Sequence, residues 1–292
     1  MPEGVEVPGD DVTLVLDAYG DEEAPGVLLA HGGGQTRHSW GGTARWLGTS
    51  GYQAVTVDLR GHGDSSWSPE GRYDLADHAE DLRRVAAWMG APPAFVGASL
   101  GGLSSLVAIA EMPDQSAVAS ALVLVDVAIH LELEGIARIG QFMRARPNGF
   151  ASLEEVADAV AAYNPHRPRP SDLSGLRKNV RQGDDGRWRW HWDPRIMRDP
   201  KVDEPRTILH RQRLERDAAS LSVPTLLVRG RNSDLLSERG ARRFLDLVPH
   251  AEFVDVAGAG HMVAGDRNDT FNDGIVGFLQ RVQPVRRETL ER

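Results

Sequence analysis

The sequence predicts an α/β fold: a doubly wound, mostly parallel sheet that carries an inserted helical cap. Short apolar runs alternate with amphipathic stretches through the first half of the chain. These runs are apolar on both faces, as strands must be in a parallel sheet covered by helices. The alternation stops at residue 128 and resumes after residue 219. The sheet is therefore expected to be interrupted by one long insertion.

The predicted strands are short runs rich in Val, Leu and Ala. In chain order they cover residues 12–19, 26–30, 52–58, 94–97, 121–127, 223–228 and 251–256. Residues 74–89 place Leu75, Leu82, Val85 and Met89 at helical spacing, which predicts one apolar helix face. Further helices are predicted over residues 103–112 and 269–282. Strands that alternate with helices in this way are typical of a parallel sheet.

Residues 128–219 contain no convincing buried strand. Helices are predicted over residues 131–144, 153–163 and 205–219, separated by loops rich in Pro and Arg. We interpret this stretch as a helical cap over one edge of the sheet. Residues 1–127 and 220–292 are then expected to form the core domain.

Composition excludes several classes of function. The formal charge of −9 gives no electrostatic reason to expect a nucleic-acid partner. The chain has no cysteine, so disulfides, thiolate nucleophiles and cysteine-based metal sites are excluded. The first residues lack the charged and apolar regions of a signal peptide, and no apolar run is long enough to span a bilayer. We expect a cytoplasmic protein without a membrane partner, as a monomer or homodimer.

Ser99 stands where a strand is predicted to turn into a helix. The segment 97–101 reads Gly-Ala-Ser-Leu-Gly, which matches the pattern G-x-S-x-G between an apolar strand and an apolar helix. Such a tight turn holds the serine in a strained conformation, and the flanking glycines let strand and helix approach closely. The helix N-terminus also favours negative charge beside it. The context predicts a nucleophile, with a plain structural turn as the alternative.

A serine hydroxyl becomes a good nucleophile only when a neighbouring base takes its proton. Of the ten histidines, His261 lies in a glycine-rich loop after the last predicted strand. That loop is at the carboxyl edge of the sheet, where ligands bind in such folds. His31 and His62 also follow strands, but they lie in glycine-rich turns and are expected to bond the loop backbone.

Two aspartates compete to orient His261. Asp234 follows the strand 223–228 and precedes a helix, whereas Asp126 ends the strand 121–127 just before the insertion. Both give the chain order serine, aspartate, histidine. We favour Asp234, because its loop leads normally into a helix while Asp126 can serve to anchor the junction with the cap.

Consecutive glycines follow the strand 26–30, in the run His31-Gly32-Gly33-Gly34. Glycines let backbone N–H groups turn toward a ligand without interference from side chains. The N–H groups of Gly33 and Leu100 are therefore predicted to stabilise an oxyanion. The alternatives are a plain glycine turn and a phosphate-binding loop. The second has little support, because neither of the nucleotide-binding patterns G-x-x-x-x-G-K-[ST] and G-x-G-x-x-G is present here.

Four motifs together resemble the α/β-hydrolase superfamily. They are His31-Gly32-Gly33-Gly34 with Ser39-Trp40, Asp58-Leu59-Arg60-Gly61-His62-Gly63-Asp64-Ser65, Gly97-Ala98-Ser99-Leu100-Gly101-Gly102, and Gly260-His261. The branch that they resemble is that of capped carboxylesterases related to epoxide hydrolases, perhydrolases and meta-cleavage-product hydrolases. The resemblance implies an eight-stranded sheet, a helical cap between strands six and seven, no cofactor and no metal. It maps the triad onto Ser99, Asp234 and His261, and the oxyanion donors onto Gly33 and Leu100.

The nucleophile position separates the activities within this branch. Epoxide hydrolases and haloalkane dehalogenases carry an aspartate there, whereas this chain has Ser99. The expected chemistry is hydrolysis of small or medium carboxylic esters or lactones through an acyl-enzyme. The alternatives are a C–C bond hydrolase of the meta-cleavage type, a perhydrolase and a non-catalytic ligand receptor.

Aromatic side chains and a methionine are candidates for an apolar substrate pocket. They are Trp40, Phe142, Met143, Trp188, Trp190 and Trp192. Each is equally explained by packing of the cap or the core.

Overall fold

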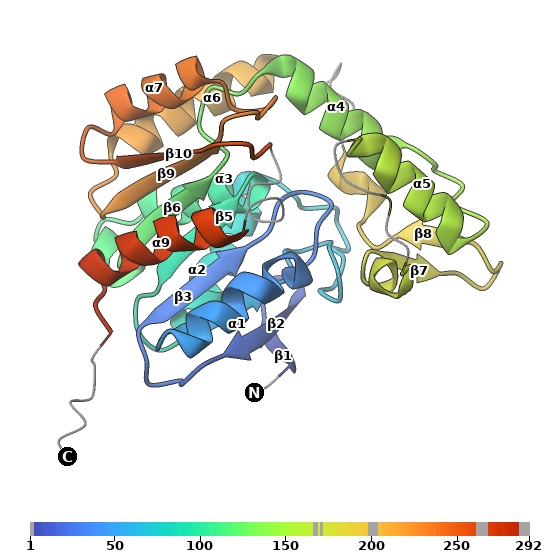
Figure 1. Ribbon diagram of the computed structural model, residues 1–292, viewed down its shortest axis with the longest axis horizontal. Coiled ribbons are helices and arrows are strands. Elements are labelled where there is room, and N and C mark those ends of the chain that lie inside the picture. The colour runs from blue at the N-terminus through green and yellow to red at the C-terminus, as the bar shows by residue number, and fades with distance from the viewer. Residues whose placement is uncertain (1–2, 166–168, 170–171, 198–203, 261–267, 286–292) are drawn as a thin grey trace.

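The computed structural model describes residues 3–165, 169, 172–197, 204–260 and 268–285. Eight strands form one sheet (Figure 1) in the order β1-β2-β4-β3-β5-β6-β9-β10. Their bounds are Glu3–Pro8 (β1), Thr13–Tyr19 (β2), Gly26–Ala30 (β3), Gln53–Val57 (β4), Ala94–Ala98 (β5), Ala121–Val125 (β6), Thr225–Gly230 (β9) and Glu252–Val256 (β10). The predicted eight-stranded α/β sheet is confirmed.

The sheet is parallel from β4 to β10 and antiparallel at one edge. Strand β2 pairs antiparallel with both β1 and β4, whereas β3, β5, β6, β9 and β10 run parallel to their neighbours. The central parallel strands are covered on both faces, since all five residues of β3, β4 and β6 are buried. Their carboxyl ends therefore meet at one edge of the sheet. The loops after β3, β5, β6 and β9 carry the candidate site.

Helices cover both faces of the sheet. One face packs against α2 (Leu75–Trp88), α3 (Leu100–Ala110), α6 (Glu204–Ala219) and α7 (Glu238–Leu247) through residues such as Leu82, Leu106 and Phe244. The other face packs against α1 (Gly41–Thr49) and α9 (Asn268–Val282), where Leu47, Ile275 and Phe278 are buried. None of the described helices combines the length and the apolarity that a bilayer crossing requires.

The chain between β6 and β9 adds no strand to this sheet. It contains α4 (Leu133–Arg144), α5 (Leu153–Tyr163) and the short 3-10 helices η3 (Ser174–Lys178) and η4 (Pro194–Ile196). Two short strands that the sequence did not predict, β7 (Val180–Gln182) and β8 (Trp188–Trp190), form a separate antiparallel pair. These elements lie to one side of the sheet in Figure 1, around a small core of their own. The chain rejoins the main core within α6, because Leu214 and Ala218 are buried there.

Close packing of β5 against α3 depends on glycine. A Cβ atom at Gly101 would lie 2.4 Å from the carbonyl oxygen of Ala30, and backbone cannot move away as a flexible side chain can. We expect Gly101→Ala to lower the free energy of unfolding by roughly 1–3 kcal/mol, as overpacking does. Gly175→Ala is the control, since nothing lies within 4 Å of its added methyl group. Thermal unfolding of both variants measures the difference, and equal melting temperatures would contradict the close contact.

Candidate active site

Ser99 occupies a strained turn between β5 and α3. Its backbone has φ 48° and ψ −115°, a conformation that non-glycine residues seldom adopt. The turn is held by hydrogen bonds on both sides. The N–H of Gly101 donates to the carbonyl of His31 at 3.1 Å, and the N–H of Leu103 donates to the carbonyl of Ser99 at 3.1 Å. Strain of this kind persists only where its surroundings enforce it, and it is common at reactive residues.

The glycine loop after β3 lies directly against Ser99. A Cβ atom at Gly32 would be 3.3 Å from the Cβ of Ser99. Two N–H groups of the glycine loop already form hydrogen bonds. Gly32 donates to Oε1 of Gln35 at 2.9 Å, and Gly34 donates to Nε2 of His62 at 3.1 Å. Gly33 stands between them and lines the cavity described below. Its N–H has no hydrogen-bond partner among the described residues.

Leu100 is the first residue of α3, so its N–H has no partner within the helix. Gly33 and Leu100 therefore each have a backbone N–H group close to the Ser99 turn that is not used in the described loop or helix. Two such donors beside a serine hydroxyl at a helix N-terminus are what an oxyanion hole would require.

Two buried histidines hold the glycine loop in place. Nε2 of His31 accepts a hydrogen bond from the N–H of Leu59 at 3.0 Å, and its Nδ1 donates to the carbonyl of Gly32 at 2.8 Å. His62 accepts from Gly34 and lies 5.1 Å from the His31 ring. The prediction that both rings bond the loop backbone is confirmed. Burial lowers the pKa of His31 to about 4 and that of His62 to about 3, which keeps both rings neutral and able to accept.

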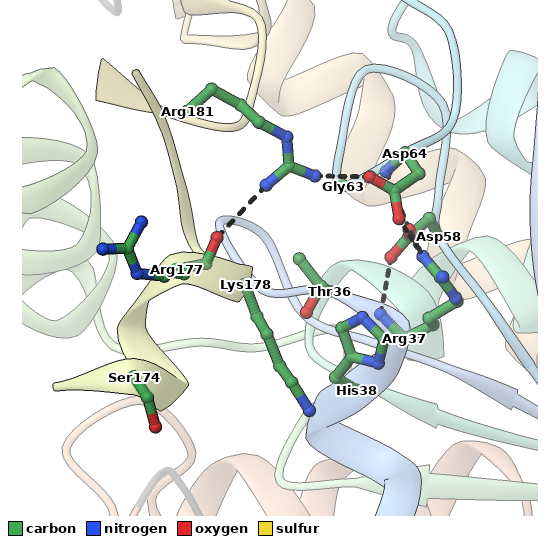
Figure 2. Close-up of a pocket in the computed structure, with 10 residues that line it drawn as sticks. All are labelled: Thr36, Arg37, His38, Asp58, Gly63, Asp64, Ser174, Arg177, Lys178 and Arg181. Carbon is green, nitrogen blue, oxygen red and sulfur yellow. Dashed lines mark hydrogen bonds and ion pairs between the residues drawn. The ribbon is translucent and has the colours of Figure 1, made fainter. Parts of the chain in front are cut away.

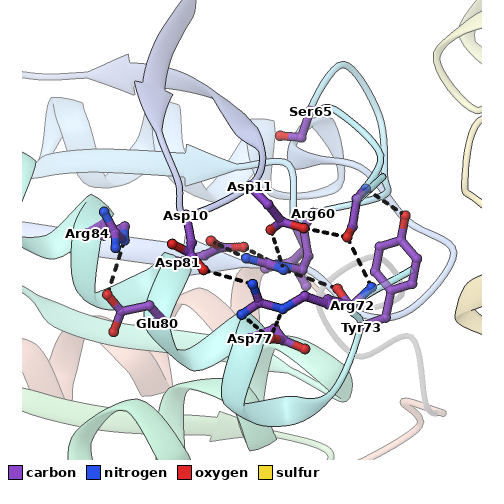
Figure 3. A network of polar contacts seen from close by, with 12 residues as sticks. Asp10, Asp11, Arg60, Ser65, Arg72, Tyr73, Asp77, Glu80, Asp81 and Arg84 are labelled. Atoms are coloured by element: carbon purple, nitrogen blue, oxygen red, sulfur yellow. Dashed lines mark hydrogen bonds and ion pairs between the residues drawn. The ribbon is translucent and has the colours of Figure 1, made fainter. Parts of the chain in front are cut away.

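The residues from Asp58 to Ser65 form the scaffold beneath this loop. The carboxylate of Asp58 accepts hydrogen bonds from the backbone N–H and the guanidinium of Arg37, and from the N–H of Asp64 at 2.9 Å. Gly63 passes so close to Asp58 that any side chain would collide with the carboxylate. Buried Arg60 is paired with Asp81 at 2.6 Å and with Asp11 at 3.1 Å (Figure 3). Removing one partner of such a buried pair would leave an uncompensated charge.

A third buried histidine makes the fold sensitive to acid. Neither ring nitrogen of His78 has a hydrogen-bond partner among the described residues, and burial holds its pKa well below the usual value. A pKa lowered in the folded state means that the unfolded chain binds protons first as the pH falls. The free energy of unfolding therefore has its full value above pH ~6.5. Below that pH it declines by up to about 1.4 kcal/mol per pH unit for each such histidine.

His78→Leu is expected to melt no lower than the wild type near pH ~7, because an apolar side chain of similar size replaces an unpaired polar ring. Its melting temperature should then fall less than that of the wild type when the pH drops to about 5. Thermal unfolding at both pH values measures the two slopes. Identical slopes would show that His78 does not contribute to acid sensitivity.

Asp126 follows β6 and is buried at the end of the sheet. Its backbone has φ 49° and its side chain is fully inaccessible. Oδ1 accepts a hydrogen bond from the N–H of Gly230 at 2.9 Å, and Oδ2 accepts from the hydroxyl of Ser233 at 2.5 Å. The carboxylate is thus fixed between the ends of β6 and β9.

Asp234 lies in a different environment. Its side chain is 41% exposed and pairs with the guanidinium of Arg138 on α4 at 2.9 Å. Helix α4 approaches this loop closely, since a Cβ atom at Gly135 would lie 2.5 Å from the carbonyl oxygen of Asp234. The Arg138 guanidinium also stands 5.2 Å from the ring centre of Tyr163. Asp234 therefore connects the β9 loop to the segment between β6 and β9.

His261 lies outside the described residues. The preceding loop is tied to the loop after β9, because the N–H of Asn232 donates to the carbonyl of Ala259 at 2.9 Å. Residues that follow β5, β6, β9 and β10 in sequence thus approach one edge of the sheet. Three strand ends that carry Ser99, Asp126 and Asp234 are neighbours there.

A cavity of about 380 Å³ opens onto Ser99. One wall is the glycine loop with Trp40, which is 1% exposed. The opposite wall belongs to the segment between β6 and β9. There Phe142 stacks on Tyr163 at 4.2 Å between ring centres, and Trp190 stacks on Trp192 at 4.8 Å. An aromatic cavity with a few polar groups is typical of a small-molecule site.

Five of the six pocket candidates from the sequence line this cavity, namely Trp40, Phe142, Met143, Trp190 and Trp192. Trp188 packs within the insertion instead, with the guanidinium of Arg177 at 5.1 Å from its ring centre. The sequence reasoning missed several lining residues, namely Gln35, Thr36, His38, Ile139, Val160, Tyr163, Asn164, Lys178 and Asn179.

Comparisons with known proteins identify the family. A model of the alpha/beta hydrolase family matches residues 27–273. The chain belongs to this family. Esterase Rv0045c of Mycobacterium tuberculosis is 32% identical over 263 residues, which cover 88% of this chain and 83% of that protein. The sn-1-specific diacylglycerol lipase ABHD11 of Mus musculus is 27% identical over 279 residues, covering 89% and 82%.

Solved structures agree on the fold. The structure of the M. tuberculosis esterase superposes with a TM-score of 0.73 at 30% identity, over 96% of this chain and 92% of that chain. The structure of E-2-(acetamidomethylene)succinate hydrolase superposes with a TM-score of 0.81 at 23% identity, over 94% and 98%.

Proposed function

We propose that the protein is a serine hydrolase that cleaves small or medium carboxylic esters. The observation that carries the proposal is Ser99, which is strained at the strand-to-helix turn and open to an aromatic cavity. Beside it, the N–H of Gly33 has no hydrogen-bond partner among the described residues. The relatives named esterase and diacylglycerol lipase support the same reaction class. The hydroxyl attacks the ester carbonyl, the alcohol leaves, and water releases the acid from the acyl-enzyme.

The proposed base is His261, which takes the proton of Ser99 and later returns it to the leaving alcohol. Gly33 and Leu100 donate N–H groups to the oxyanion that forms on the carbonyl. For the acid that orients His261 we now propose Asp126 in place of Asp234. Asp126 is buried and fixed by Gly230 and Ser233, whereas Asp234 is half-exposed and paired with Arg138. A triad acid acts by holding an imidazolium in a fixed orientation away from water, which suits Asp126.

Residues 128–219 act in this proposal as a cap over the core formed by residues 1–127 and 220–292. Met143 and Trp192 lie against the glycine loop, since a Cβ atom at Gly34 would be 3.4 Å from Trp192 and 3.5 Å from Met143. A cavity of about 380 Å³ closed on this side accommodates a small or medium ester but not a polymer.

Labelling with a fluorophosphonate tests the proposal. The expected result is one covalent adduct, mapped by mass spectrometry to the peptide that contains Ser99, together with hydrolysis of p-nitrophenyl acetate. Turnover of a ring-cleavage dienoate without turnover of the ester would identify a C–C bond hydrolase instead. Unlabelled protein that turns over neither compound would contradict a serine hydrolase.

A further inference from the structure

A second, polar cavity adjoins the one that contains Ser99. Its volume is also about 380 Å³, and it lies between the turn after β3, the loop after β4 and η3 (Figure 2). The two cavities share three lining residues, Thr36, His38 and Lys178. These three side chains therefore stand at the junction of the two cavities.

The polar cavity carries an excess of positive charge. Its lining includes four cationic side chains, those of Arg37, Arg177, Lys178 and Arg181, against the carboxylates of Asp58 and Asp64. His38 adds no charge near neutral pH, because burial together with the charges of Arg37 and Lys178 lowers its pKa. Two positive charges are thus left without a carboxylate in the lining.

The cations differ in what they already bind. Arg37 is buried and held by Asp17, Asp58 and Asp64, and Arg181 pairs with Asp64 at 2.5 Å. Arg177 lies over the ring of Trp188 and is directed away from the cavity in Figure 2.

Lys178 is the remaining cation of this lining. Its side chain extends from η3 toward His38, as Figure 2 shows. In the part of the chain that the structure describes, it forms no ion pair with a carboxylate. Among the described residues, Lys178 therefore presents an ammonium group without a carboxylate partner at the junction of the two cavities.

We propose that Lys178 binds a carboxylate that the substrate carries away from its ester bond, so that the preferred substrates are half-esters of dicarboxylic acids or hydroxy acids acylated on their hydroxyl group. This inference rests on the proposed esterase function of Ser99. The hydrophobic part of the substrate lies along Trp190 and Trp192, and its charged end reaches the junction. Lys178 is exposed to solvent, so its ammonium group attracts this carboxylate through opposite charge while both groups stay partly hydrated.

Two matched esters test this preference. They are 4-nitrophenyl hydrogen adipate and 4-nitrophenyl hexanoate, which differ only in a carboxylate on the far end of the acyl chain. In a second pair of esters, one compound has a carboxylate on its alcohol part and the other has none. The quantity compared is the ratio of kcat/KM for the charged ester to that for the neutral ester. We expect Lys178→Gln to lower the wild-type ratio about three- to tenfold in at least one pair, mainly through KM.

Lys178→Arg is expected to keep most of the preference, since it keeps the charge. Arg239→Gln is the matched control, because it removes a cation from α7 whose side chain is 76% exposed and outside both linings. It should leave the ratio unchanged. The preference should also shrink as ionic strength rises, because the lysine is exposed to solvent.

The outcomes separate this inference from the proposed function. A ratio in Lys178→Gln equal to that of the wild type in both pairs would overturn the lysine subsite while ester hydrolysis stands. If the wild-type protein hydrolyses none of the four esters, the proposed function itself fails. An equal loss in Arg239→Gln would show that net charge, not Lys178, causes the preference.

Discussion

Replacement of Ser99 by alanine is expected to lower kcat/KM for p-nitrophenyl acetate by at least about 10⁴-fold. The physical reason is that alanine has no hydroxyl to form the acyl-enzyme, so the two-step route is lost. The backbone donors remain, and they retain only a small residual rate over the uncatalysed reaction. Steady-state kinetics of the purified variant measures the loss, and the fluorophosphonate adduct should disappear with it.

Stability distinguishes this chemical loss from unfolding. Alanine keeps the Cβ of Ser99 and all the backbone hydrogen bonds of the turn, so the melting temperature should stay close to that of the wild type. Ser116→Ala is the control, since it removes an exposed hydroxyl bonded to Asp114 beyond the C-terminal end of α3, whereas Ser99 precedes the N-terminal end. It should change neither property. Activity retained by Ser99→Ala would exclude Ser99 as the nucleophile.

The central strands were predictable because their chemistry is local. β3 spans Gly26–Ala30, the bounds that the apolar run predicts, and α2 ends one residue inside its predicted range on each side. β1 carries no such signal, since only Val7 of its six residues is buried. The β7–β8 pair was missed for a related reason. Its half-buried tryptophans alternate with exposed Arg189, and pairing depends on a partner strand rather than on its own pattern.

The same distinction between local sequence signals and features that depend on distant residues applies to the candidate site. Ser99 was predictable because its glycines and the flanking strand and helix are contiguous in sequence. Lys178 was not, because its neighbours Thr36 and His38 are distant in the chain and only folding brings them together. The two aspartates show the limit most clearly. Both follow strands and both give the same chain order, so only burial and hydrogen bonding separate them.

Exchange of these aspartates for asparagine is therefore expected to have unequal effects. Asp126→Asn should lower kcat by about 10²- to 10⁴-fold, because a neutral amide holds neither the correct histidine tautomer nor the imidazolium. The amide oxygen can still accept from Gly230, and the amide nitrogen can donate to the hydroxyl of Ser233. The geometry of the loop is thereby retained, so the loss is expected mainly in the chemical step.

Asp234→Asn is the matched control on the neighbouring loop. It removes the pair with Arg138, and an exposed ion pair contributes less than about 1 kcal/mol. We expect kcat within about threefold of the wild-type value and a small fall in melting temperature. Rates and thermal unfolding of both variants, measured side by side, decide between the residues. A large loss of kcat in Asp234→Asn with little loss in Asp126→Asn would return the role of the acid to Asp234 and leave Asp126 as the anchor between β6 and β9.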